Sequence, residues 1–92
     1  MRIRWTKPAA NDLTHIADYT KEHFGSSQAH VAVLAIYEAA KSLEAHPHRG
    51  RPGRKAKNRE MVVPGLPFVM AYRIRGDTIE IIRILHGAQR WP

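Results

Sequence analysis

The 92-residue chain contains no cysteine, which excludes disulfide bonds and thiolate metal sites. It also lacks an apolar run long enough to span a bilayer, and its first ten residues, MRIRWTKPAA, lack the apolar core of a signal peptide. A chain of this length has room for one small hydrophobic core. We therefore expect a cytoplasmic protein that is not membrane-bound and consists of a single domain over residues 1–92.

Acidic residues are scarce: the chain has eight Asp and Glu residues and fifteen Lys and Arg residues, which gives a net charge of +7. Such a charge on a short chain favours an anionic partner, either nucleic acid or an acidic protein. Much of it lies in residues 46–58, a predicted loop rich in Pro and Gly, and just after it. The basic residues there that we expect to bind a target are Arg51, Arg54, Lys55, Lys57 and Arg59. The six histidines lie apart from close carboxylates, so we predict neither a metal site nor a cofactor.

Two amphipathic helices are predicted in the first half of the chain. Residues 7–23 have apolar residues at three- and four-residue spacing, with Thr6 as N-cap and Gly25 as the end signal. Residues 28–45 have a second such stripe of apolar residues. They predict a helix that Ser26 or Ser27 caps and that ends before Pro47. The short connection predicts an antiparallel helical hairpin.

The last third of the chain is typical of β-strands. Residues 68–75 and 78–86 flank a two-residue turn at Gly76-Asp77, and residues 59–63 form a strand before them. This turn pairs Arg75 with Thr78, Arg73 with Glu80, Tyr72 with Ile81, Ala71 with Ile82 and Met70 with Arg83. One face, predicted to lie under the helices, then contains Phe68, Met70, Tyr72, Ile74, Ile79, Ile81, Arg83 and Leu85; the other contains Val69, Ala71, Arg73, Arg75, Glu80, Ile82, Ile84 and His86. We expect Tyr72 to be a packing residue, and Arg83 to pair with Asp12 or Asp18 because a lone charge on an apolar face is costly.

With a further strand at residues 1–6, the predicted order is β-α-α-β-β-β. This is an α+β fold, in which a helical hairpin packs on one face of a small, mostly antiparallel sheet. The first strand can lie parallel to a later one through the long helical crossover, which is right-handed by rule.

Specific motifs then resemble a known family. The pattern A-x-x-D-L-x-x-I-x-x-Y begins at Ala9, and the tail REMVVPGLPFVMAYRIRGDTIEIIRILHGAQRW begins at Arg59. Together with the opening strand, they resemble the RelE/ParE toxins of bacterial type II toxin–antitoxin modules over essentially the whole chain. The resemblance implies a growth-inhibiting toxin that a cognate acidic antitoxin wraps and neutralises in a hetero-oligomer. It also implies that operator DNA is bound only through the antitoxin.

Two activities are implied by the family: RelE-like members cut mRNA on the ribosome without metal, and ParE-like members poison DNA gyrase. The resemblance places Glu60 and Val62 where the nuclease branch has lysines, and Val69 where it has an arginine. These departures favour the ParE-like function. If the chain is a ribonuclease instead, Glu60, His86 and Arg90 are the candidate catalytic residues, because cleavage needs a base, a proton donor and cations.

Further candidates for target or nucleic-acid binding are Arg73, Gln89 and Trp91. Each candidate has a structural alternative: His86 can close the sheet, Arg73 can simply pair with Glu80, and Trp91 can dock on the helices instead of stacking on a base. The basic loop can clamp nucleic acid or help to capture the antitoxin. A non-toxic nucleic-acid-binding module and an inactive relative that keeps only antitoxin binding and autoregulation remain open.

Overall fold

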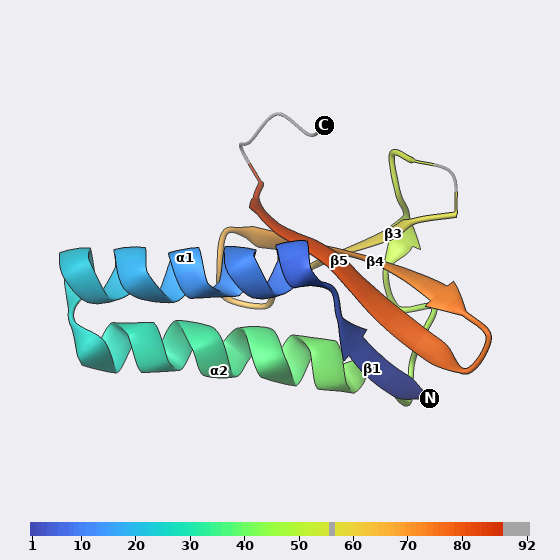
Figure 1. The fold of residues 1–92 in the computed structure, drawn as a ribbon, viewed down its shortest axis with the longest axis horizontal. Coiled ribbons are helices and arrows are strands. Elements are labelled where there is room, and N and C mark those ends of the chain that lie inside the picture. Colours follow the sequence, from blue (N-terminus) through green and yellow to red (C-terminus); the bar gives the residue numbers. More distant parts are fainter. Residues whose placement is uncertain (56, 88–92) are drawn as a thin grey trace.

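The computed structural model describes residues 1–55 and 57–87, and it places two helices on one face of a five-stranded sheet within these residues (Figure 1). The elements are β1 (Arg2–Trp5), α1 (Lys7–Phe24), α2 (Ser26–Ser42), β2 (Arg51–Pro52), β3 (Arg59–Val62), β4 (Phe68–Arg75) and β5 (Thr78–His86). The strand order is β1-β5-β4-β3-β2, with β1 parallel to β5 and the other neighbours antiparallel. The predicted fold is confirmed, including the parallel first strand. The two-residue β2 corrects the prediction that residues 46–58 form only a loop.

The helical hairpin is tighter than predicted. The Thr6 hydroxyl accepts the Ala9 N–H at 3.4 Å, which confirms this cap of α1. Within the described residues no side chain caps α2, which begins at Ser26 directly after Gly25, so the predicted serine cap is wrong. Gly25 has φ of +93°, a backbone conformation that favours glycine, and one residue is therefore enough to reverse the chain.

The core lies between the helices and the face of the sheet that they cover. Its fully buried side chains include Ile36 of α2, Leu43 directly after α2, and Tyr72 and Ile81 of the sheet. Tyr72 confirms the packing prediction, and its hydroxyl has a second role. It donates to the Pro47 carbonyl at 2.8 Å and accepts the Gly50 N–H at 2.9 Å, which joins the sheet to the chain that leaves α2.

A β-bulge divides the β4–β5 hairpin into two registers. From the turn to the Tyr72–Ile81 pair the predicted register is confirmed, including Arg73 opposite Glu80. Ala71 then pairs with Arg83 instead of Ile82, so one extra residue of β5 shifts every later side chain to the other face. Ile84 consequently belongs to the core and His86 follows it on the helix-covered face. The predicted faces of residues 83–86 are therefore wrong, whereas Ile82 lies on the predicted face beside Ala71.

Asp12 connects α1 to the part of β5 that has no neighbouring strand on the β1 side. Its carboxylate accepts Arg83 Nε at 2.7 Å and Nη2 at 3.1 Å, which confirms the predicted ion pair. It also accepts the backbone N–H of Ile84 at 2.9 Å. Because β1 ends at Trp5, this part of the β5 edge lies beyond the parallel pairing, and a helix carboxylate takes the place of a strand carbonyl. The hydrogen bonds from Arg83 to Asp12 raise the pKa of the Arg83 guanidinium above its ordinary value.

In the described part of the chain, neither helix is long and apolar enough to cross a bilayer.

Candidate functional site

An apolar groove runs between the halves of α1 and α2 that meet at Gly25 and the turn that connects β3 to β4. The helices extend beyond the sheet on this side, and the turn lies next to them (Figure 1). The groove has a volume of about 550 Å³ and is lined by His15, Ile16, Tyr19, Thr20, Phe24, Gln28, Val31, Ala32, Leu66, Pro67, Phe68 and His86. Phe24 is 66% exposed and Tyr19 is 59% exposed, which is unusual for aromatic side chains of a small domain. A groove of this kind suits the apolar side chains of a partner segment.

His86 lies at the rim of this groove. It pairs with Phe68 across the β4–β5 hairpin, and the two rings meet edge to face with centroids 5.9 Å apart. The sequence prediction placed His86 on the opposite face, together with Arg73. The bulge reverses that placement, because it adds one residue to β5 before His86 is reached.

Glu60 lies on the face of the sheet that is turned away from the helices, and it is 4% exposed. Its carboxylate accepts the backbone N–H of Arg54 at 3.0 Å. The guanidinium groups of Arg51 and Arg54 approach it to 3.5 Å and 3.8 Å, respectively. β2 forms at this point, with Arg51 directly opposite Glu60 in the register. The buried carboxylate therefore holds the basic loop against the sheet.

A small hollow of about 60 Å³ lies beside Glu60, with Ala71 in its lining. Arg83 also lines it, but its guanidinium is bound to Asp12. The remaining lining residues are Arg54, Lys55, Asn58, Ile82 and Leu85. At about 30 Å³ for each water molecule, the hollow has room for about two. Its one carboxylate, that of Glu60, forms ion pairs with Arg51 and Arg54.

The other predicted target-binding residues are dispersed. Arg59 donates through Nε and Nη2 to the Gly50 carbonyl at 3.0 and 2.6 Å, and through Nη2 to the His48 carbonyl at 3.1 Å, so it holds the loop in place. Arg73 donates to Glu80 at 2.6 Å, which confirms that pairing. Lys57 is exposed and has φ of +68°, an uncommon conformation for a lysine. Gln89, Arg90 and Trp91 lie outside the described residues.

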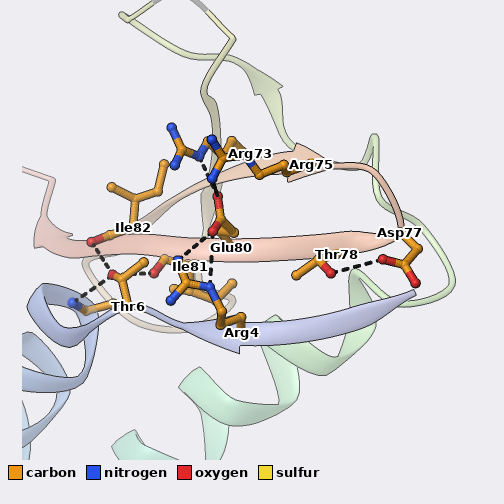
Figure 2. Close-up of polar contacts among 10 residues, drawn as sticks. Arg4, Thr6, Arg73, Arg75, Asp77, Thr78, Glu80, Ile81 and Ile82 are labelled. Atoms are coloured by element: carbon orange, nitrogen blue, oxygen red, sulfur yellow. Dashed lines mark hydrogen bonds and ion pairs between the residues drawn. The ribbon is translucent and has the colours of Figure 1, made fainter.

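The sequence analysis missed a cluster of arginines near the β4–β5 turn (Figure 2). Two Arg-Ile-Arg sequences, at Arg2–Arg4 and Arg73–Arg75, lie on the strands that flank β5. We call the residues Arg2, Arg4, Arg73 and Arg75 the arginine grid. The sequence signal for this cluster was the alternation of an exposed Arg with an inward-facing Ile in both segments. That alternation predicts a cluster only once β1 and β4 are known to be the two neighbours of β5.

Glu80 is the anion at the centre of the arginine grid, and it is 3% exposed. Arg4 donates to it through Nε at 3.1 Å and Nη2 at 2.5 Å, Arg73 through Nε at 2.6 Å, and Arg75 Nη1 lies 3.7 Å away. The hydrogen bonds from Arg4 and then Arg73 lower the pKa of Glu80 from its ordinary 4.5 to about 2. The carboxylate is therefore ionised throughout the physiological range.

Among the described residues, no group of three or more His, Asp and Glu side chains is arranged to hold a metal ion.

Comparison with known proteins identifies the family. Residues 3–91 match the sequence model described as "ParE toxin of type II toxin-antitoxin system, parDE". The Y4kP protein of Sinorhizobium fredii is 38% identical over 91 residues, covering 99% of this chain and 93% of the relative. Toxin RelE2 of Caulobacter vibrioides is 35% identical over 88 residues, covering 96% of this chain and 97% of the relative.

Two solved structures share the fold. A chain of the chromosomal ParDE toxin–antitoxin system from P. aeruginosa superimposes with a TM-score of 0.86 at 34% identity, covering 94% of this chain and 95% of that one. A chain of the RelBE2 toxin–antitoxin complex from Mycobacterium tuberculosis has a TM-score of 0.66 at 23% identity, covering 92% and 95%, respectively. The order of elements, the tail motif and these matches agree, and the chain belongs to the RelE/ParE family of toxins from type II toxin–antitoxin systems.

Proposed function

We propose that this toxin inhibits growth as a poison of DNA gyrase, acting through a binding surface without a catalytic step of its own. The observation behind the proposal is that Glu60 and His86 lie on opposite faces of the sheet. In metal-free RNA cleavage, the base and the proton donor must flank the same phosphate within hydrogen-bond reach. The sheet that separates the two side chains argues against such a shared site and supports the proposal.

The surroundings of Glu60 also argue against RNA cleavage. The carboxylate is occupied by Arg51 and Arg54, so it is not placed to take a proton from a ribose hydroxyl. Farther along the same strands, Val62 and Val69 form a cross-strand pair. Two of the three positions where the nuclease branch of the family has cations are thus apolar, and they offer nothing to the charge that develops on a cleaved phosphate.

We further propose that a cognate antitoxin neutralises the toxin by placing apolar side chains in the groove around Phe24 and Tyr19. The solved relative from P. aeruginosa belongs to a toxin–antitoxin system. The net charge of +7 favours an acidic partner, and the exposed aromatic side chains supply a contact surface for it.

The test uses the purified toxin in two reactions. With gyrase and plasmid DNA we expect loss of supercoiling and accumulation of gyrase-bound cleaved DNA, and His86→Ala should behave like the wild type. With ribosomes programmed with mRNA we expect intact message. Message cleavage that His86→Ala or Glu60→Gln abolishes would overturn the proposal in favour of the RelE-like activity.

The antitoxin site has its own test and a matched control. Phe24→Asp in the groove should leave growth inhibition intact but prevent rescue by a co-expressed cognate antitoxin. Leu34→Asp introduces the same charge at an exposed position of α2 outside the groove, and it should still be rescued. Equal rescue of both variants would contradict the groove as the antitoxin site.

A further inference from the structure

We propose that the arginine grid binds the phosphate backbone of duplex DNA directly, without antitoxin or gyrase. The proposal goes beyond gyrase poisoning, because it gives the toxin a DNA contact of its own. It stands on the register of three strands, on the buried glutamate between them and on the chemistry of the surrounding face.

The register places the four arginines at the corners of a rectangle. Arg4 and Arg73 both lie opposite Glu80, so one row crosses β1, β5 and β4. Arg2 and Arg75 both lie opposite Thr78 and form the next row. Because strands are about 4.8 Å apart and rise about 3.3 Å per residue, the corners are spaced roughly 10 Å across and 7 Å along the sheet.

All four side chains project from the face turned away from the helices. Ile3 and Ile74, between the arginines of each pair, pack against the core, and side chains alternate along a strand. Figure 2 shows Arg4, Arg73 and Arg75 converging on Glu80 from its two neighbouring strands.

Glu80 orients the guanidinium groups without cancelling their charge. Four arginines and one carboxylate leave a charge of +3, and Asp77 in the adjacent turn reduces it to +2. Arg73 uses one N–H donor on Glu80 and Arg4 uses two, and a guanidinium has five. The remaining donors are held at fixed positions on an exposed surface, as phosphate recognition by arginine requires.

Two shallow hollows beside the grid extend the basic surface. One, of about 420 Å³, is lined by Arg2, Ile3, Arg4, Arg75, Thr78 and Glu80. The other, of about 360 Å³, is lined by Lys57, Asn58, Arg73, Ile74 and Arg75, so Lys57 contributes a fifth cation. Within the described residues, therefore, the grid continues into the basic loop.

The composition of this face favours duplex DNA over other anions. Single-strand sites use aromatic side chains on which bases stack, and the exposed aromatic residues of the described chain, Tyr19, Phe24 and Tyr37, lie on the helices. An acidic protein would need apolar anchors beside the charges, and the apolar groove lies on the helix side. Contacts made only to phosphates predict binding that is independent of sequence and strongly salt-dependent.

The test is the binding of a fluorescein-labelled duplex of mixed sequence by the full-length toxin, followed by anisotropy over a series of salt concentrations. The variant Arg2→Gln/Arg75→Gln spares Arg4 and Arg73, the two arginines that hydrogen-bond Glu80, so the fold should persist; circular dichroism checks this. The control Lys21→Gln/Lys41→Gln removes the same charge from exposed helix positions.

We expect the grid variant to bind more weakly and to lower the slope of log K against log salt by about 1.8, since each lost phosphate contact contributes about 0.9. The helix control should keep the wild-type slope. Three results would overturn the proposal: equal effects of both variants, tighter binding of single-stranded DNA, or displacement of the duplex by polyglutamate at equal charge concentration. The last result would assign the grid to an acidic protein. Because the reaction contains no gyrase, its outcome is independent of the proposed gyrase poisoning.

Discussion

Replacing Asp12 by Ala tests how α1 is attached to the sheet. The Asp12 side chain is 17% exposed and accepts three hydrogen bonds, two from Arg83 and one from the Ile84 backbone. The Asp12→Ala variant leaves a buried backbone donor of β5 without its acceptor, which costs about 1–3 kcal/mol. The lost ion pair adds less than about 1 kcal/mol, because the Arg83 side chain is 36% exposed and partly screened by solvent.

We therefore expect Asp12→Ala to lower the free energy of unfolding by about 2–3 kcal/mol. For a domain of this size, this corresponds to a fall in Tm of roughly 10–20 °C. Asp12→Asn keeps one carbonyl oxygen for the Ile84 N–H and should lose less. Asp18→Ala is the matched control, since it removes an exposed carboxylate from the same helix, and it should change stability by less than about 0.5 kcal/mol.

Urea unfolding followed by circular dichroism gives these values, and a double-mutant cycle with Arg83→Ala isolates the pair. The expected coupling is at least about 0.5 kcal/mol, because the two side chains are in direct contact. Additive effects within about 0.3 kcal/mol, or a cost of Asp12→Ala no larger than that of Asp18→Ala, would refute the reasoning.

Three further predictions concern Glu80, Tyr72 and Gly50. Because the folded-state pKa of Glu80 is about 2, below its ordinary 4.5, its contribution to stability is complete above about pH 4.5 and is lost as the pH falls towards 2. In urea titrations at a series of pH values, Glu80→Gln should thus show a smaller fall of unfolding free energy over this pH window than the wild type. An equal fall in both proteins would contradict the lowered pKa of Glu80. Tyr72→Phe removes the hydroxyl that joins Pro47 to Gly50 and should cost about 1–3 kcal/mol, whereas Tyr37→Phe, at a half-exposed ring, should be neutral. Gly50→Ala should also destabilise the chain, because a Cβ there would lie 2.7 Å from the Tyr72 hydroxyl; a wild-type melting curve would contradict this packing.

The sequence predicted the hairpin register only as far as its turn could determine it. Gly76-Asp77 sets the pairs from Arg75–Thr78 to Tyr72–Ile81, and these are confirmed. Beyond them β5 continues as Ile82, Arg83, Ile84 and Leu85, and a run with so many apolar residues does not show which face each side chain takes. The bulge is therefore invisible in the pattern, although it decides where His86 lies.

The candidate sites show the same dependence on tertiary structure. Glu60 and His86 were grouped by chemical type, and the sheet separates them. The arginine grid was missed because Arg4 and Arg73 are far apart in sequence and come to lie on either side of Glu80 only through the parallel β1–β5 pairing. β2 was missed because a two-residue strand that includes Pro52 has no periodicity to detect.

The most direct test of gyrase poisoning is tightly controlled expression of the wild-type toxin in bacteria, with pulse-labelling of protein and DNA synthesis in the first minutes. The proposal predicts that DNA synthesis stops and cells filament while translation continues, and that His86→Ala has the same effect. Prompt loss of translation with cleaved mRNA, abolished in His86→Ala, would contradict it.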